Sequence, residues 1–264
     1  CEVGGYWKTR SDKEQLIRYA QFGEMTACMI NGGTNGAFTN NLPWYHDQET
    51  EKIYRHAVWL HNALMPYLFS ETVRTHLNGG SLIKGVNFDQ ESHILGHDIF
   101  TKAITSPGGE MEFNLPANGQ WIDFWTNKTY QPETSISEVY GLDRFPLFIR
   151  QGAIIPLIIQ NSYAGIGNAS LKNKQTVLIY PYEKTSYRYY RPTGTGTDYD
   201  IIDITFDNIT GALEVNGESN LSYAFIIQNV DKPRETIHGE WEYNAEDRSL
   251  TIFKQGKDFS LNTK

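Results

Sequence analysis

Hydrophobic residues recur at helical spacing soon after the first ten positions of the chain. The run from Ser11 to Glu14 has the form of a capping box, with a hydroxyl residue at the cap and a glutamate three residues later. Residues 1–3 are typical of the end of a β-strand, and Gly4-Gly5 are typical of the tight turn that follows. We therefore predict a strand, a turn and a helix whose apolar face carries Leu16, Ile17, Tyr19, Ala20 and Phe22.

A second strand and a longer helix follow. The apolar stretch Thr26–Ile30 is short enough for a strand, and a polar loop rich in Gly and Asn separates it from the helix. Pro66 is expected to kink this helix and Gly79-Gly80 to end it. Its predicted apolar face consists of Ile53, Tyr54, Ala57, Val58, Leu60, His61, Leu64, Tyr67 and Leu68.

These first 80 residues therefore contain two β/α units. Two such units cannot complete an α/β sheet, because their strands need parallel neighbours on both sides. The pattern indicates a piece of a larger α/β domain.

Beyond residue 80 the pattern changes to short runs of β-forming residues separated by Gly and Pro turns. The first series comprises Leu82–Phe88, Asp98–Ile104, Met111–Leu115 and Trp121–Trp125. The second comprises Val177–Tyr180, Ser186–Arg191, Ile201–Phe206, Ala212–Val215, Tyr223–Gln228 and Ser249–Phe253. This spacing predicts two small antiparallel β-sandwiches in tandem. The predicted fold class is α/β plus all-β, with domains at residues 1–80, 81–160 and 161–264.

The composition is that of a globular protein, with 39% hydrophobic and 20% charged residues in a chain of 264. Its net charge is −8 and it has no basic run, which argues against nucleic acid because phosphate neutralisation needs clustered Lys and Arg. No apolar run approaches the length of a membrane-spanning helix. We therefore expect neither a nucleic-acid partner nor a membrane partner.

No metal ion or cofactor is expected either. Cys1 and Cys28 are too few for a cysteine-based zinc site, and whether they pair is left open. His93 and His97 lie four residues apart, as a helical metal pair would, but Gly96 stands between them and no third ligand is evident.

Several stretches, in order over residues 1–160, resemble motifs of glycoside hydrolase family 31. CEVGGY is similar to that family's Asp-Ile-Gly-Gly-Phe turn. PWYHDQETEKIYRHAVWLHNALMPYLFS resembles its Pro-Trp, acidic residue and long helix with a Leu-Pro-Tyr-Leu-Tyr-Ser block. LPANGQWIDFWTNKTY and LDRFPLFIRQGAIIPL resemble its Leu-Pro-x-Gly-x-Trp-x-Asp-Phe-Trp and Pro-Leu-Phe-Val-Arg-x-Gly-x-Ile-Ile-Pro segments.

Members of this family are retaining exo-acting α-glycosidases built on a (β/α)8 barrel with β-sandwich domains behind it. The resemblance implies that residues 1–80 are the last two β/α units of such a barrel and that two antiparallel β-sandwich domains follow. The expected function is that of a C-terminal fragment of an enzyme that hydrolyses terminal α-linked sugars from oligosaccharides. Its expected partners are an oligosaccharide or glycoside substrate and the remaining N-terminal part of the same enzyme. The alternative is a non-catalytic carbohydrate-binding or scaffolding β-sandwich module, against which the β/α segment argues.

Catalysis in this family needs two carboxylates, which in retaining enzymes lie about 5–5.5 Å apart. Both are Asp residues on barrel strands and loops ahead of the segment that this chain matches, and no stretch here resembles theirs. We therefore assign no catalytic residue to this chain and predict that it is inactive alone.

Two residues of CEVGGY are candidates for the substrate pocket. Glu2 matches the family's Asp on the seventh barrel strand and is one methylene longer; the other interpretation is a buried acid satisfied by turn amides. Tyr6 matches an aromatic residue that borders the first sugar subsite, where a ring face suits sugar C–H groups. Packing beside the two glycines is the other interpretation of Tyr6.

The end of the second strand departs from the family pattern. An Arg and a His two residues apart usually bind the terminal sugar there, but those positions hold Ile30 and Gly32. Asn31 is the polar side chain left to bind sugar hydroxyls, or it is a turn residue before two glycines. Trp44 either lines the pocket from the last loop or caps the long helix, with Asp47 near the positive end of the helix dipole. We expect plain α-glucosides to be disfavoured.

Overall fold

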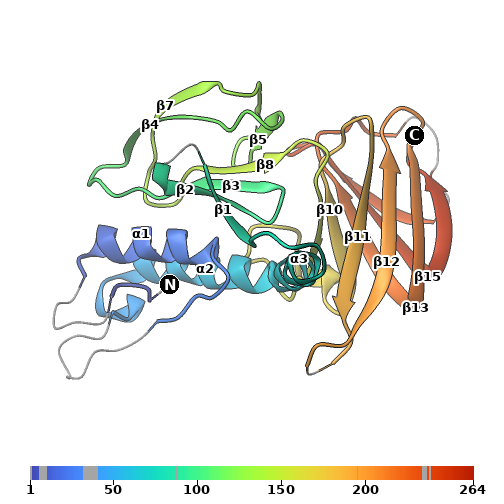
Figure 1. Cartoon of the computed structure of the whole chain (residues 1–264), viewed down its shortest axis with the longest axis horizontal. Coiled ribbons are helices and arrows are strands. Elements are labelled where there is room, and N and C mark those ends of the chain that lie inside the picture. The colour runs from blue at the N-terminus through green and yellow to red at the C-terminus, as the bar shows by residue number, and fades with distance from the viewer. Residues whose placement is uncertain are drawn as a thin grey trace. The chain divides into compact units, whose positions relative to one another are not determined.

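The computed structural model describes residues 2–5, 11–31, 41–86, 89–194, 196–233, 237 and 239–264, which form two compact units (Figure 1). The first unit comprises Cys1–Asn62, Ile83–Ile149 and Tyr163–Gly165, and the second comprises Ala63–Leu82, Arg150–Ser162 and Ile166–Lys264. The predicted division into three domains is a different partition and stays a prediction.

Two α-helices of the first unit lie where the periodicity predicts helices, but Tyr19 and Val58, which were predicted on their apolar faces, are exposed. The N-cap of the first is Asp12, whose side chain accepts a hydrogen bond from Gln15 N, and not Ser11 as predicted. The Ser11 hydroxyl is used elsewhere, since it donates to Gly4 O at 3.0 Å. The helical segments here are α1 (Lys13–Glu24), the 3₁₀ turn η1 (Pro43–Tyr45) and α2 (Gln48–Ala63).

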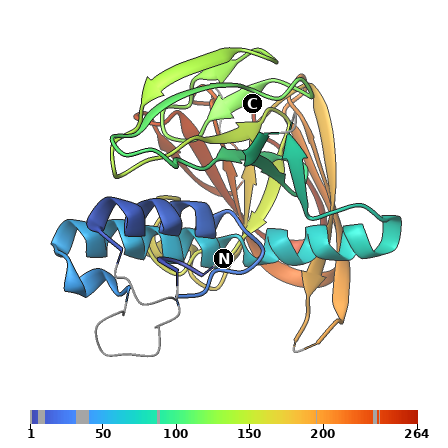
Figure 2. The same cartoon turned by 60° about the vertical axis from the view of Figure 1, so that its left-hand side comes forward.

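Helices α1 and α2 lie side by side in both Figures 1 and 2. The predicted strands at residues 1–3 and Thr26–Ile30 reduce to one parallel bridge, between Glu2 and Ile30. A small apolar core joins the helices to this bridge: Val3, Leu16, Ala20, Tyr54 and Ala57, with Met29 packed against it. The parallel pairing and the two helices agree with the predicted pair of β/α units.

The rest of the first unit is β-structure. In the described residues a six-stranded sheet has the order β1-β2-β3-β8-β5-β6, and β4 pairs with β7 in a separate ribbon. The buried aromatic rings of Phe100, Phe113, Trp121 and Phe148 pack together in its core. Its strands are β1 (Ile83–Val86), β2 (Asp89–Leu95), β3 (Ile99–Lys102), β4 (Glu110–Asn114), β5 (Trp121–Asp123), β6 (Thr129–Tyr130), β7 (Ser135–Val139) and β8 (Leu147–Arg150).

The second unit contains a larger sheet. Among described strands it has the order β11-β12-β13-β10-β9, with β15 pairing to β13 and β14 to β15. The prediction of an antiparallel sheet is wrong at one place, because β10 and β13 run parallel, with Gln175 opposite Tyr223. Its strands are β9 (Ile154–Leu157), β10 (Gln175–Ile179), β11 (Lys184–Pro192), β12 (Tyr199–Asp207), β13 (Ala212–Ile227), β14 (Glu240–Asn244) and β15 (Ser249–Asn262), with the 3₁₀ turn η2 at Ala169–Leu171.

One helix, α3 (Met65–Asn78), belongs to the second unit. Pro66, which was predicted to kink one long helix, lies in the first turn of α3, and the structure has two helices, α2 and α3, in place of the kinked one. Tyr187 of β11 donates to Ser70 Oγ at 3.0 Å and to Glu71 Oε1 at 2.9 Å, so α3 is bonded directly to the sheet. The helix ends at Gly79, as predicted, in a left-handed conformation with φ of 79°.

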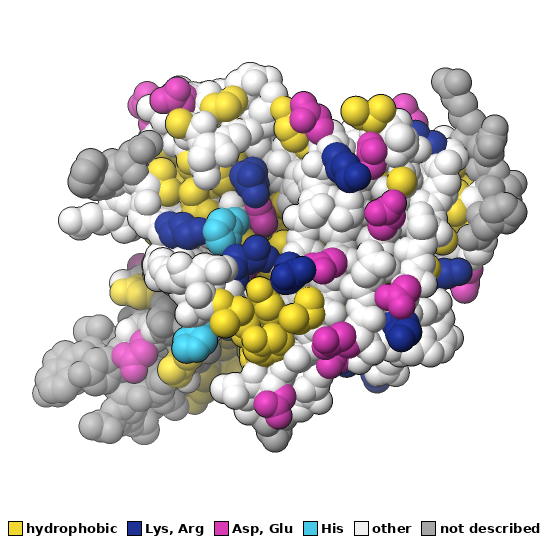
Figure 3. All heavy atoms as spheres, turned by 45° about the vertical axis from the view of Figure 1, so that its right-hand side comes forward, with side chains coloured by type: hydrophobic (Ala, Val, Ile, Leu, Met, Phe, Trp, Pro, Cys, Tyr) yellow, Lys and Arg dark blue, Asp and Glu magenta, His cyan; other side chains and the backbone are white. Residues whose placement is uncertain are grey.

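Acidic and basic side chains intermingle over the face drawn in Figure 3. On that face the described residues form no continuous basic track of the kind that follows a phosphate backbone. No helix in the described ranges combines the length and the hydropathy needed to cross a bilayer.

Candidate functional site

The candidate site is built on the two paired segments of the first unit. Val3 N donates to Ile30 O at 2.7 Å, next to the bridge between Glu2 and Ile30. Side chains alternate along extended segments, so Glu2 and Ile30 lie on the face opposite to Val3 and Met29, which pack against the helices. Glu2 is exposed, so it is not the buried acid of the alternative interpretation.

Asn41 holds the ends of these segments in place. Its side chain is fully buried, accepts from Ser11 N at 2.9 Å and donates to Gly4 O and Gly5 O at 2.6 and 3.0 Å. Gly4 has a φ of 81°, and a Cβ at this position would lie 2.5 Å from the Asn41 Cβ. Only glycine therefore fits the first turn position.

Asn31 completes the same network from the second segment. Its amide nitrogen donates to Asn41 O at 2.7 Å and to the hydroxyl of Tyr54 at 2.6 Å. Burial raises the pKa of Tyr54. The two amide hydrogens of Asn31 are thus used within the protein, and its buried Oδ1 has no partner among described residues. Asn31 is therefore directed toward α2, whereas Glu2 and Ile30 lie on the other face.

Trp44 lies in η1, which begins two residues after Asn41, and its side chain is 61% exposed. Asp47, and not Trp44, caps α2: its Oδ1 accepts from Thr50 N at 2.9 Å and from Thr50 Oγ1 at 2.8 Å. Lys13 of α1 binds the other carboxylate oxygen at 2.8 Å, and this contact holds the pKa of Asp47 well below its usual range. The capping role thus belongs to Asp47, and the Trp44 ring remains available at the surface.

A different acidic residue lies at the other end of α1. Glu24 is completely buried at the end of α1, and neither carboxylate oxygen has a partner among described residues. Burial raises its pKa well above the ordinary value. The neighbouring carbonyls of Glu24 and Met25 accept from His61 Nδ1 and His93 Nε2, at 3.1 and 2.7 Å, and burial lowers the pKa of both imidazoles.

His93 therefore serves a structural bond in β2. In the described ranges no three metal-ligating side chains come together.

Two family models match this chain. The glycosyl hydrolase family 31 TIM-barrel domain matches residues 1–71, and the family's C-terminal domain matches residues 84–155. An α-xylosidase of Saccharolobus solfataricus is 26% identical over 95% of this chain and 37% of its own length. The chain belongs to glycosyl hydrolase family 31.

Solved structures of the family share the fold of this chain. A cycloalternan-forming enzyme from Listeria monocytogenes, solved with a pentasaccharide substrate, superposes with a TM-score of 0.82 at 18% identity. A family 31 dextranase of Flavobacterium johnsoniae, solved with glucose, gives a TM-score of 0.80 at 20% identity. These matches cover 98% and 99% of this chain but 28% and 39% of the other chains, so the family 31 chain spans about a third of such structures.

The bridge and its two helices lie in the segment that the TIM-barrel model matches. Helices surround the strands of such a barrel, so the face of Glu2 and Ile30, opposite to α1 and α2, corresponds to the interior. Glu2 and Asn31 stand where a segment ends and a loop begins, which is the end at which TIM-barrel active sites form. Glu24, at the turn from α1 into the next segment, lies at the other end.

The structure thus places Glu2 and Asn31 at the ends of neighbouring segments, because Glu2 pairs with Ile30 and Asn31 follows it, but their side chains lie on opposite faces. Tyr6 and Gly32 lie outside the described residues. Sequence reasoning missed Asn41, the residue that fixes both ends. Its only sequence signal is its position between a Gly- and Asn-rich loop and the Pro-Trp that begins η1.

Proposed function

We propose that this family 31 chain is the C-terminal part of a retaining exo-acting α-glycosidase, which removes terminal α-linked sugars from oligosaccharides. In this proposal the rest of the barrel supplies both catalytic carboxylates, and residues of this chain form one side of the substrate pocket.

The parallel bridge between Glu2 and Ile30 carries the proposal. It lies in the segment that the TIM-barrel model matches, and the ends of its two segments are held by hydrogen bonds of Asn41 and Asn31. Parallel pairing with two covering helices is typical of α/β barrels and is not typical of a carbohydrate-binding β-sandwich.

Each candidate residue has a distinct proposed role. Glu2 accepts hydrogen bonds from sugar hydroxyls, and Ile30 beside it presents an apolar surface where the family usually has Arg. Tyr6 and Trp44 supply ring faces against sugar C–H groups. Asn31 holds the strand end through Asn41 and Tyr54, which leaves only its oxygen for a substrate contact.

The loss of the usual Arg and His bears on specificity. A site built to bond a hydroxyl discriminates by roughly 10⁴–10⁵ against a ligand that lacks it, because its polar groups are left unpaired. A site without those donors should conversely lose its advantage for plain α-glucosides. We propose that it favours α-xylosides, α-galactosides or N-acetylated sugars; a relative at 26% identity is an α-xylosidase.

A substrate panel on the complete polypeptide tests this proposal. Nitrophenyl α-glycosides of glucose, xylose, galactose and N-acetylglucosamine should give a best substrate other than the glucoside. Glu2→Gln should lower kcat/KM for that substrate about 10- to 100-fold, because a hydrogen bond to a charged group is lost. Glu112→Gln is the matched control, since Glu112 is an exposed strand glutamate in β4. A glucoside that is by far the best substrate, or equal activity of the two variants, contradicts the proposed pocket.

The chain alone provides the second test. Residues 1–264 should hydrolyse none of these glycosides above a contaminant control, because losing even one catalytic carboxylate removes several orders of magnitude of rate. Turnover by the purified chain would overturn the assignment of both carboxylates to the rest of the barrel.

A further inference from the structure

A groove of about 630 Å³ lies within the first unit, between α1 and the β2 and β3 segments. Gln15, Tyr19 and Phe22 line it from α1, and Gln90, Ile104 and Pro107 line it from the other side.

The face of α1 that lines the groove differs from the face that packs against the bridge. Its residues Gln15, Tyr19 and Phe22 follow each other at spacings of four and three, which places them in one stripe along α1. The core contact with the bridge uses Leu16 and Ala20 instead. The groove is therefore distinct from the site formed by Glu2 and Asn31.

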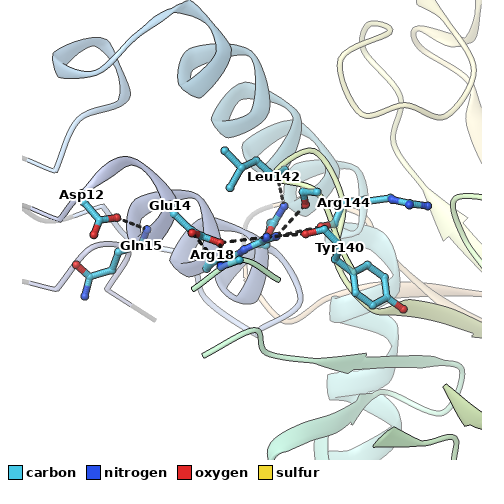
Figure 4. A network of polar contacts seen from close by, with 10 residues as sticks. Asp12, Glu14, Gln15, Arg18, Tyr140, Leu142 and Arg144 are labelled. Carbon is cyan, nitrogen blue, oxygen red and sulfur yellow. Dashed lines mark hydrogen bonds and ion pairs between the residues drawn. The ribbon is translucent and has the colours of Figure 1, made fainter. Parts of the chain in front are cut away.

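Buried polar contacts hold the α1 wall of the groove in a fixed position (Figure 4). Arg18, a groove residue that is 8% exposed, donates to Tyr140 O at 2.8 Å, to Gly141 O at 3.0 Å and to Arg144 O at 3.1 Å. Gln21 adds a bond to Leu142 O at 2.7 Å. The helix is thus tied to the segment 140–144 by four hydrogen bonds from side chains to backbone carbonyls, and the groove is pre-formed rather than assembled on binding.

Glu14 extends this framework to the far side of the groove. Its carboxylate accepts from Gly108 N at 3.1 Å and from Arg18 at 3.4 Å. The side chain of Gln15 takes no part in the network and extends away from it in Figure 4.

The groove leaves an aromatic ring and two amides accessible. Tyr19 is 39% exposed, and Gln15 and Gln90 are exposed with no side-chain partner among described residues. An aromatic face packs against apolar C–H groups, while amides and carboxylates bond donors and acceptors at fixed angles. A sugar ring presents both kinds of group, since C–H bonds cover its faces and hydroxyls surround its edge.

The charge of the groove selects among such ligands. Asp12, Glu14 and Glu91 line it with Arg18, and Lys102 pairs with Glu91 at 3.1 Å, so three carboxylates face two cations and an anionic ligand would meet net repulsion. We propose that this groove is a second saccharide-binding site, separate from the substrate pocket, which takes a neutral oligosaccharide with one ring on Tyr19. It would hold a saccharide whether or not the proposed glycosidase activity is correct.

Titration calorimetry of the chain with maltotriose and isomaltotriose tests the proposal, and saturation-transfer NMR identifies the bound rings. Tyr19→Ala should weaken binding about tenfold, as loss of a central aromatic contact does. Tyr19→Phe should retain most of the affinity because it keeps the ring. The matched control is Tyr182→Ala, since Tyr182 is 41% exposed in the second unit and Tyr19 is 39% exposed. Trigalacturonate should bind more weakly than either neutral sugar.

Two further variants distinguish a loss of groove binding from misfolding of Tyr19→Ala and from an effect on the substrate pocket. Gln90→Ala, on the opposite wall, should weaken binding even where Tyr19→Ala fails to fold. Asn31→Ala should leave this binding unchanged, which separates the groove from the substrate pocket. Absence of binding to both trisaccharides, equal affinity of Tyr19→Ala and wild type, or equal losses in Tyr19→Ala and Tyr182→Ala would each overturn the proposal.

Discussion

The strand ends at Glu2 and Ile30 and the large sheet of the second unit are held in place by different means. In the sheet, β13 and β15 pair from Ala212 opposite Asn262 to Ile227 opposite Leu250, with one register shift between Asn216 and Leu221. At the strand ends a single bridge is present, and side-chain amides satisfy the backbone groups instead.

This difference has an energetic consequence. Buried backbone N–H and C=O groups must be hydrogen-bonded. In the sheet many equivalent bonds between strands satisfy these groups, whereas at the strand ends the side chain of Asn41 satisfies them. The sheet should therefore be sensitive to loss of packing volume, and the strand ends to the loss of individual atoms. Irregular backbone held by specific side chains is also typical of binding sites, which are disproportionately found in loops on a rigid scaffold.

The largest expected effect lies in the core of the sheet. Phe225 is fully buried, stacks on Tyr223 at 5.3 Å and meets Phe259 edge-on at 6.1 Å between ring centroids. Phe225→Ala should lower the free energy of unfolding of the second unit by about 3–5 kcal/mol. Hydrogen exchange resolved by segment measures this loss separately in each unit. Phe225→Leu, as a control, should cost less than about 1.5 kcal/mol; equal losses in both variants would mean that volume is not what holds this sheet.

At the strand ends, the addition of a single methyl group should be enough to destabilise the first unit. Gly4 and Gly5 both have positive φ, but only at Gly4 does an added Cβ meet another atom, the Cβ of Asn41 at 2.5 Å. Gly4→Ala should therefore destabilise the first unit by about 1–3 kcal/mol more than Gly5→Ala, because backbone strain is common to both and overpacking to one. The same exchange experiment compares them. Equal stability of the two variants would show that the turn moves away from Asn41 without cost.

A third effect depends on pH. Burial raises the pKa of Glu24 well above that of an unfolded glutamate, so the folded protein retains a proton that the unfolded chain releases. Stability is then full below the unfolded pKa and falls by about 1.4 kcal/mol per pH unit until the folded pKa is passed.

Glu24→Gln removes this titration, whereas the lowered pKa values of His61 and His93, which make stability rise with pH, are common to both proteins. The stability of the wild type relative to that of Glu24→Gln should therefore fall between pH 5 and 8. Unfolding free energies at several pH values measure the two slopes. Glu112→Gln, at an exposed strand glutamate, should leave the wild-type slope unchanged. A wild-type stability that rises with pH relative to that of Glu24→Gln would contradict the argument, because it requires a folded pKa of Glu24 below the unfolded one.

Much of the fold was predictable because periodicity is a local property. Both helices of the first unit, the break at Pro66 and the stop at Gly79 follow from spacing and from residues with restricted backbones. The cap at Asp12 was missed because Ser11 beside it is an equally good cap residue, and only the contact to Gly4 decides between them.

Pairing in the sheets was less predictable. Polar residues interrupt β13 between Val215 and Tyr223, so its two halves were predicted as separate strands, although one 16-residue strand runs through. The parallel neighbour β10 depends on tertiary contacts with no local sequence signal. In the site, Glu2 was proposed from a family motif and Asn31 from a departure from one, and both stay predictions as substrate residues. A buried residue such as Asn41, which joins several segments, is recognisable only when those segments are in place.

The smallest expected effect distinguishes two possible roles of Asn31, which are to hold the strand end and to contact the substrate. Its amide donates to the Tyr54 hydroxyl at 2.6 Å, so Tyr54→Phe removes that acceptor and Asn31→Ala removes the donor. A double-mutant cycle of unfolding free energies in the first unit should give a coupling of about 0.5–1.5 kcal/mol, the value of one hydrogen bond. Tyr67→Phe, at a buried tyrosine of α3 in the second unit, should show no coupling with Asn31→Ala. If Asn31 and Tyr54 also fail to couple, their bond does not hold the strand end, and the Asn31 amide is then free to serve a substrate. A coupling of the expected size instead makes Asn31 a positioning residue, whose loss should act on substrate binding only through the displacement of its neighbours.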